Sequence, residues 1–327
     1  MKETRFINSS GPTERYVPLN DAVLVRGRTF PADPFPGTGF SNKYRLPVLA
    51  TDDGFLVAGY RNGIVVDRYK KQGKGYYRAF TEVVTIDPQA RVTNLKRLSD
   101  GSLLLAWYRE VPNTSMSYTQ FSTSKDGYWR TLSVAWDNLS PGMPWLSADF
   151  AQDSTGLIQY FAQHDSNNTM CRITLADDLS VRSIELGFVP KGTPLSCEAE
   201  SPYIVCEPYL DGVILAYHSA DYKFFSLTPH LKGARINVTT VSPAGEHLPL
   251  YQTPDYAEKL NPFALMGAFI VYCPIDPVTL TYDDLKLLGV DGYSRMLGKT
   301  KLPMYFRNSG NSYAHNTLAG KVEVITI

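Results

Sequence analysis

Residues 53–61 read DGFLVAGYR, and this stretch decides the fold because copies of it return about every fifty residues along the chain. Residues 100–109 (DGSLLLAWYR) and 211–218 (DGVILAYH) repeat it closely. Weaker copies occupy residues 153–160 (DSTGLIQY), 267–272 (GAFIVY) and 320–325 (GKVEVI). Each copy combines a tight turn with an apolar run, which is the pattern of a turn that leads into a buried strand.

A strand-built repeat of this length is typical of a β-propeller, in which each repeat forms one four-stranded blade. The six copies therefore predict an all-β, six-bladed β-propeller spanning residues 41–327 as a single domain. Residues 1–40 are rich in Pro and Gly and predict an irregular N-terminal segment with one strand at residues 22–25. We expect this strand to pair with residues 322–327 and close the ring, because closure removes the open sheet edges.

Composition excludes several classes of function. Lys+Arg and Asp+Glu both number 32, so the net charge is zero and no broad basic face for nucleic acid is predicted. No apolar run is long enough to span a membrane, and no signal peptide is visible, which favours synthesis in the cytoplasm. The four cysteines form no CxxC pair, which argues against a zinc site, and we expect them to be buried thiols. No phosphate-binding or dinucleotide motif is present, so we expect neither a metal nor a cofactor.

Two further motifs connect the repeat to a known family. Residues 44–47 read YRLP, directly before the first repeat, and residues 122–129 read STSKDGYW, after the second. Together they resemble the sialidase superfamily, whose first blade opens on a similar Arg-Leu-Pro phrase and whose blades carry an Asp-box, here contracted by one residue on each side of its glycine. We expect Asp126 and Gly127 to form a turn between outer strands, away from the axis.

The resemblance implies a set of site residues. In the family an arginine triad binds the substrate carboxylate, and Arg45 matches its first member through the YRLP phrase. Asp67 lies where the acid/base aspartate is expected, and Arg61 ends a strand where relatives place a substrate-contacting arginine. Tyr313 precedes the last strand, where the family has its nucleophile.

The glutamate that activates the nucleophile is less sharply placed by the resemblance. Glu200 precedes the turn at residues 211–212, as the family's glutamate precedes its own turn, but Glu198 and Glu207 remain alternatives. Planar guanidinium groups suit a carboxylate ligand, and a phenol avoids placing a charged nucleophile against an anionic sugar.

The chain also departs from the family. His218 stands where the second arginine is expected, and residues 261–276 contain no arginine for the third. Arg109 and Arg307 are candidate substitutes. Because each charged hydrogen bond contributes about 1.5–3 kcal/mol, two missing arginines predict poor sialoside hydrolysis.

Two functions remain open at this stage. We favour a catalytically degenerate propeller that binds a surface glycan or docks to a protein partner in a larger assembly, such as a virion or phage tail component. The alternative is a retaining exo-glycoside hydrolase that acts on an atypical sugar through Tyr313, Glu200 and Asp67. Oligomerisation is compatible with both.

Overall fold

The computed structural model describes most of the strands and the short turns between them. The described residues are 2–5, 47–60, 63–72, 75–110, 117–133, 148–164, 169–188, 204–218, 233–258, 263–276, 279, 281, 283–298, 303–309, 312–317 and 322–326. Within these ranges the regular structure is all strand, apart from one short 3-10 helix, Lys125–Gly127. The prediction of an all-β chain is therefore confirmed.

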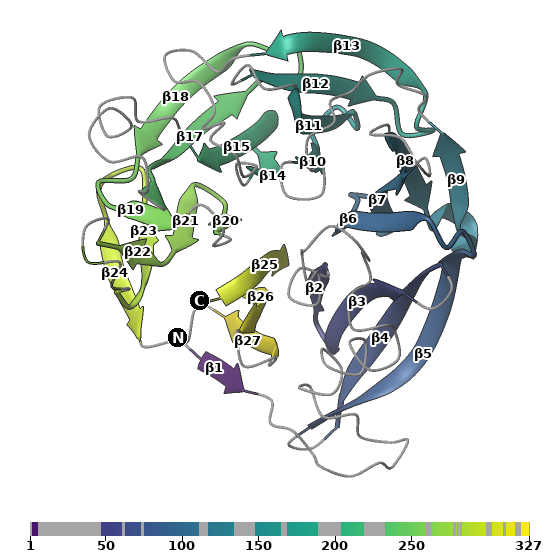
Figure 1. The fold of residues 1–327 in the computed structure, drawn as a ribbon, viewed down its shortest axis with the longest axis horizontal. Coiled ribbons are helices and arrows are strands. Elements are labelled where there is room, and N and C mark those ends of the chain that lie inside the picture. Colours follow the sequence, from purple (N-terminus) through teal and green to yellow (C-terminus); the bar gives the residue numbers. More distant parts are fainter. Residues whose placement is uncertain are drawn as a thin grey trace.

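The strands form a closed ring of radially arranged antiparallel sheets, which is a β-propeller (Figure 1). Five four-stranded blades follow one another along the chain. The strands of blades 1 and 2 are β2 (Val48–Thr51), β3 (Gly54–Tyr60), β4 (Ile64–Gln72), β5 (Gly75–Thr85), β6 (Ala90–Arg97), β7 (Leu103–Glu110), β8 (Ser117–Thr123) and β9 (Arg130–Ser133). Those of blades 3 to 5 are β10 (Ala148–Gln152), β11 (Ile158–His164), β12 (Thr169–Leu175), β13 (Val181–Phe188), β14 (Ile204–Tyr209), β15 (Gly212–His218), β17 (Ile236–Val241), β18 (His247–Gln252), β20 (Ala264–Met266), β21 (Phe269–Tyr272), β23 (Leu285–Leu288) and β24 (Ser294–Gly298).

The two ends of the chain share one further sheet. Its strands are β25 (Pro303–Ser309), β26 (Ser312–Thr317), β27 (Val322–Thr326) and β1 (Lys2–Arg5), with Lys2 opposite Thr326. Strand β25 lies beside β2 and β20, so this sheet stands between blades 1 and 5 (Figure 1). The six repeats thus correspond to five blades of consecutive strands and one sheet that joins the chain ends, rather than to six equivalent blades.

The strand predicted at residues 22–25 lies outside the described residues. The strand that pairs with β27 is Lys2–Arg5, so the two chain ends lie side by side in one sheet. The N-terminal strand has no apolar alternation, so only its pairing with β27 identifies it.

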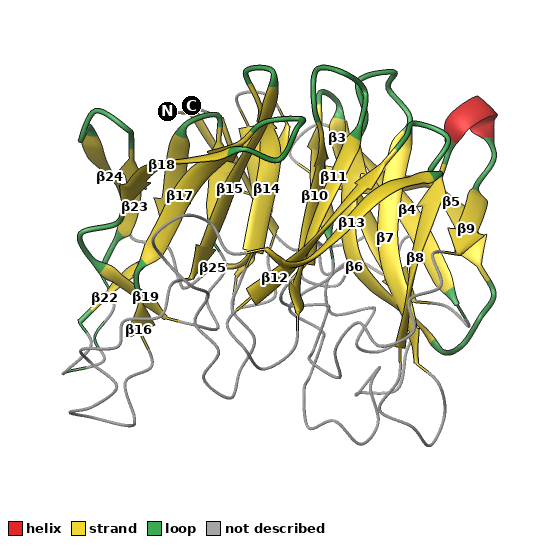
Figure 2. Cartoon of the chain, turned by 90° about the horizontal axis from the view of Figure 1, so that it is seen from above, coloured by secondary structure: helices red, strands yellow, loops and turns green. Residues whose placement is uncertain are grey.

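The repeated phrase forms the hairpin between the first and second strands of each blade. The second strand is the most deeply buried; every residue of β15 is buried, for example. Gly54 and Gly212 are required at their positions, because a Cβ on either would collide with the backbone carbonyl of Tyr69 or Val241 on the adjacent strand. These hairpins and most of the other described short turns lie on one face of the ring (Figure 2). We call it the turn face.

The predicted outer turn of blade 2 is confirmed in position. Asp126 and Gly127 lie in the 3-10 turn between β8 and β9, the two outer strands of the sheet. Trp129, just after the turn, packs against the apolar core of blades 1 and 2, and its indole Nε1 donates a 2.8 Å hydrogen bond to Glu82. The turn therefore joins two blades at the rim. A small three-stranded sheet of β16 (Gly233–Ala234), β19 (Tyr256–Glu258) and β22 (Pro274–Ile275) completes the fold.

Candidate functional site

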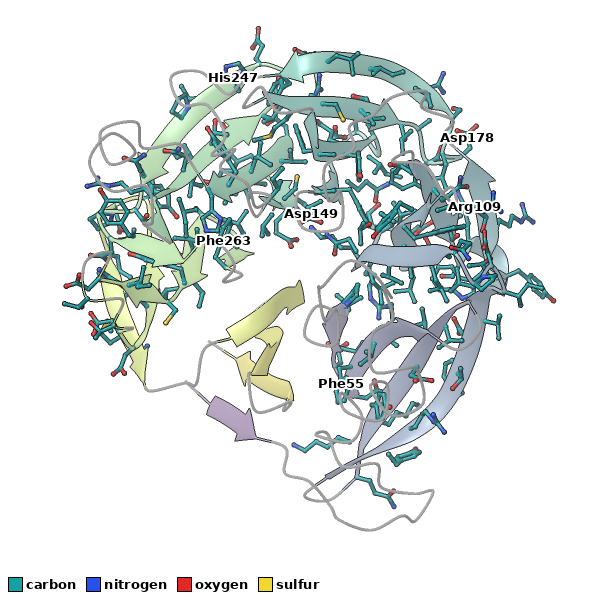
Figure 3. The ribbon with its side chains drawn as sticks, viewed as in Figure 1. Phe55, Arg109, Asp149, Asp178, His247 and Phe263 are labelled. Carbon is teal, nitrogen blue, oxygen red and sulfur yellow. The ribbon has the colours of Figure 1, made fainter. Side chains whose placement is uncertain are left out.

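The innermost strands of blades 2, 3 and 4 bring a charged cluster to the ring axis. At its centre the Asp149 carboxylate is completely buried (Figure 3). It accepts hydrogen bonds from the Lys96 ammonium at 2.9 Å, the Cys206 amide at 2.8 Å, the Asn94 amide and its own neighbour, the Phe150 amide, at 2.8 Å. One side chain thus links three blades, and its four donors satisfy the lone pairs of a buried carboxylate.

The Lys96 ammonium is held as firmly as the carboxylate. Besides Asp149 it pairs with Glu207 Oε1 at 3.2 Å and donates to the Cys206 carbonyl. The three acceptors match the three donors of an ammonium group. Removing a partner from such a buried pair costs about 3–5 kcal/mol, because the remaining charge is left unpaired. The cluster therefore fixes the spacing of the three inner strands.

Cys206 is a free thiol within this cluster. Burial raises its pKa well above the usual value, and the carboxylates of Asp149 and Glu207 raise it further, although the Lys96 charge acts in the opposite direction. The thiol therefore stays protonated and is not a nucleophile at neutral pH. Cys171 and Cys273 are also buried free thiols, as expected from the sequence, and Cys197 lies outside the described residues.

A cavity of about 470 Å³ opens above the cluster on the turn face; we call it the axial cavity. All five blades contribute to its wall. Its lining residues are Leu49, Lys96, Arg97, Leu98, Ser99, Phe150, Ala151, Gln152, Asp153, Ser154, Glu207, Pro208, Leu210 and Gly267. An apolar pocket with a few fixed polar groups, of this size, is typical of a small-molecule site.

The acidic groups of the axial cavity are already engaged. Asp153 is buried, and its carboxylate accepts hydrogen bonds from the Thr155 hydroxyl at 2.5 Å, the amides of Thr155 and Leu157, and the Gln159 side chain at 2.9 Å. Glu207 is paired with Lys96. These side chains are held in place by their partners and can orient a polar ligand.

Three of the residues predicted from the sequence, Arg45, Arg61 and Glu200, lie outside the described residues, as does the alternative Glu198. Asp67 lies on β4 of blade 1, where it is buried and accepts a hydrogen bond from the Thr81 hydroxyl at 2.5 Å.

The remaining predicted residues lie on other sheets. His218 ends β15 of blade 4; its ring is completely buried and meets Phe263 edge to face, with 5.1 Å between centroids. Arg109 lies on β7 of blade 2, half exposed, and pairs with Asp87 at 2.7 Å. Arg307 and Tyr313 lie on β25 and β26. Asp67, Arg109 and His218 are thus on three different blades, and none of them lines the axial cavity.

The axial cluster was largely missed at the sequence level, although a signal for it exists. Lys96, Asp149 and Glu207 each lie four residues before the turn aspartate of their repeat, at residues 100, 153 and 211. A charged residue at the same place in three successive repeats predicts three charges around one axis. Of these three residues, only Glu207 is among the site residues predicted from the sequence, as an alternative to Glu200.

No family model matches this sequence, and no relative is found among curated protein sequences. Solved structures do share its fold. An α-L-arabinanase from Penicillium chrysogenum, complexed with arabinobiose, is 14% identical, with a TM-score of 0.58 over 100% of this chain and 99% of that one. A thermostable family-43 glycoside hydrolase is 12% identical, with a TM-score of 0.45 over 82% of this chain and 96% of that one. A virginiamycin B lyase from Staphylococcus aureus is 12% identical, with a TM-score of 0.44 over 87% and 95%.

The arabinanase likeness supports a β-propeller for the whole chain, and it carries no argument about activity at this identity. It does not support the sialidase type specifically. In the described part of the chain, no three His, Cys, Asp or Glu side chains come together as metal ligands. Nor does any helix there have the length and apolar character of a membrane span.

Proposed function

We propose that this propeller binds a carbohydrate in the axial cavity and does not hydrolyse sialosides. The observation that carries the proposal is the cavity itself, whose wall comes from all five blades and whose charged floor is fixed by Lys96, Asp149 and Glu207. A rigid, preorganised set of hydrogen-bonding groups lowers the cost of ordering a polar ligand. The likeness to an arabinanase that holds arabinobiose is consistent with a sugar ligand.

The same geometry favours binding over catalysis. Glycoside hydrolysis usually needs two carboxyl groups that flank the scissile bond, one of them able to give up a proton. Among the described side chains of the axial cavity, Asp153 is saturated with donors and Glu207 is tied to Lys96, while Asp149 is sealed beneath them. The cavity thus presents bound carboxylates rather than an acid and a nucleophile.

The finer part of the proposal follows from the sequence. We infer a catalytically degenerate propeller of the sialidase type. Its ligand is a surface glycan, or its turn face docks to a protein in a larger assembly such as a virion. His218 in place of an arginine, and its complete burial against Phe263, support the loss of a carboxylate grip there.

One observation favours the alternative, a retaining glycoside hydrolase that acts through Tyr313, Glu200 and Asp67. Asp67 is a buried carboxylate that accepts a short hydrogen bond from the Thr81 hydroxyl, and a buried carboxyl group can serve as an acid/base group.

A binding assay and a turnover assay separate the two. We expect the protein to bind a glycan on an array, and Glu207→Gln to weaken that binding about tenfold, since it removes the charge that positions Lys96. Asp178→Asn, on the outer rim (Figure 3), is the matched control and should bind normally. Fluorogenic sialoside and arabinoside substrates should not be turned over. Turnover by the wild type that disappears in Tyr313→Phe would establish the hydrolase instead.

A further inference from the structure

We propose that the saccharide is anionic and extends from the axial cavity into a groove between blades 1 and 2, where Arg97 and Arg68 bind its acidic groups. The inference rests on the proposed function and names the class of ligand and its direction across the turn face. The groove, which we call the blade 1–2 groove, is lined by Arg68, Phe80 and Glu82 of blade 1 and by Arg97 and Leu103 of blade 2.

Arg97 connects the two spaces. It ends β6, directly after Lys96, and its side chain lines both the axial cavity and the blade 1–2 groove. The groove measures about 170 Å³, which is below the size of a complete ligand site. It is therefore best understood as an extension of the axial cavity, and Arg97 stands where a ligand would pass from one to the other.

The side chains at this passage carry a net positive charge, which favours an anionic ligand. Arg97 is exposed and makes no ion pair among the described residues. Arg68 pairs with Asp53 at 3.2 Å, but Lys70 binds the same carboxylate at 3.3 Å, which leaves one positive charge in excess. Glu82, the acid in the groove wall, accepts the Trp129 hydrogen bond but keeps its negative charge, so Arg97, Arg68 and Lys70 outnumber Asp53 and Glu82 by one charge. A guanidinium fork is the group best suited to a carboxylate or sulfate.

The groove also offers a surface for a sugar ring. Phe80 is 43% exposed, and the Arg68 guanidinium lies 5.7 Å from its ring centroid. An exposed aromatic face beside a cation suits a saccharide that carries both apolar C–H surface and an acidic substituent.

A larger groove on the turn face carries three carboxylates, and this sets the direction of the ligand. It lies between blades 3 and 4 and measures about 880 Å³. Glu185, Asp211 and Glu246 line it together with His247, and Glu185 pairs with Arg172 at 3.6 Å. We call this space the blade 3–4 groove. Arg97 is the exposed cation in the wall of the axial cavity, so an acidic substituent of the ligand is directed toward the blade 1–2 groove and away from the carboxylates of the blade 3–4 groove.

The experiment compares trigalacturonic acid with its carboxyl-reduced counterpart, which has the same sugar rings and no charge. We expect isothermal titration of the wild type to show the acid binding at least about tenfold more tightly, with affinity falling as salt rises. Arg97→Ala should remove most of this preference, and Phe80→Ala should weaken both ligands equally. Arg295→Ala, an exposed arginine on β24 of blade 5, is the matched control and should change nothing.

The outcomes separate this inference from the proposed function. Equal binding of the acid and its reduced form, or a preference that survives in Arg97→Ala, overturns the anionic ligand and leaves sugar binding in the axial cavity intact. If neither trisaccharide binds while a neutral glycan on the array does, the anionic ligand is again overturned. If no glycan of any kind binds, the proposed function itself is wrong. Circular dichroism of each variant shows that the fold is retained.

Discussion

The junction between blades 1 and 2 and the junction between blades 3 and 4 use arginine in opposite ways. Blades 1 and 2 meet through an apolar cluster against which Leu103 and Trp129 pack, and Arg97 remains at the surface. Blades 3 and 4 also share an apolar cluster, but a buried arginine, Arg172, crosses the junction. It donates to Gln159 at 3.1 Å and to the Pro243 carbonyl at 2.9 Å.

The difference shows that one fold can leave an arginine exposed at one blade junction and bury another in structural hydrogen bonds at a different junction. Arg172 is 5% exposed, and burial lowers its pKa while the Glu185 carboxylate opposes that shift. Its hydrogen bonds hold the β17–β18 turn of blade 4 against blade 3, so it cannot reach a ligand. At the other junction, apolar packing and the Trp129 hydrogen bond join the blades, and the Arg97 side chain remains exposed.

The largest effect is expected at the axis, where blades 2, 3 and 4 meet. Asp149→Ala removes the acceptor of four hydrogen bonds and leaves the buried Lys96 ammonium short of a partner. We expect a loss of about 3–5 kcal/mol in the free energy of unfolding, measured by urea denaturation. Asp178→Ala, in an exposed turn, should have a much smaller effect; comparable losses for the two variants would show that the axial cluster is not a structural centre.

The same substitution in both junctions tests the comparison directly. Arg172→Met should cost about 3 kcal/mol of unfolding free energy, because it leaves Gln159 and the Pro243 carbonyl without their donor in a buried site. Arg97→Met should stay within about 0.5 kcal/mol of the wild type, as is usual for an exposed side chain. If the two variants unfold at the same urea concentration, the distinction between a structural and an available arginine fails.

Two glycines with positive φ sharpen the comparison further. At Gly245 (φ 95°) a Cβ would collide with the Arg172 guanidinium, whereas at Gly127 (φ 78°) it would meet no atom within 4 Å. Alanine should cost about 1–2 kcal/mol at Gly127 through backbone strain alone, and more at Gly245. The double variant Gly245→Ala, Arg172→Met should be less destabilised than the sum of its parts. Strict additivity would mean that the turn does not rest on Arg172.

The smallest effect concerns pH at the blade 1–2 junction. Burial raises the pKa of Asp53, but hydrogen bonds from Arg68, Lys70 and Thr51 outweigh it and hold the pKa below the usual 3.8. The carboxylate thus contributes stability above pH 3.8, and this contribution is lost as the pH falls through the lowered pKa. In an NMR titration, Arg68→Ala should move the pKa of Asp53 upward; an unchanged value would show that the pair is not formed in solution.

Much of the fold could be predicted from the sequence because its main determinants are local. The turn at residues 53–54 and its copies at residues 100–101 and 211–212 place a flexible residue before an apolar run, which specifies a hairpin with little help from the rest of the chain. The closing strand could not be predicted in this way. Lys2–Arg5 is polar throughout, and its strand conformation is stabilised only by a partner at the other end of the chain.

The candidate site was harder to predict for the same reason. The partners of Asp149 come from blades on either side of its own, and no local pattern relates Lys96 to Cys206. Only the equivalent positions of Lys96, Asp149 and Glu207 in their repeats predict that these three side chains lie together. The residues taken from the family resemblance depended on motifs, and Asp67, Arg109 and His218 show that a motif position does not fix where a side chain points in a distant blade.

The pairing of β1 with β27 also has a consequence for how the molecule is made. The ribosome releases Lys2–Arg5 before the five blades and Val322–Thr326 after them, so the blades can form one after another before β1 has its partner. Until then Lys2–Arg5 is an unpaired strand, and such a strand can pair with another chain. Ring closure through β1 and β27 therefore cannot precede the synthesis of Val322–Thr326.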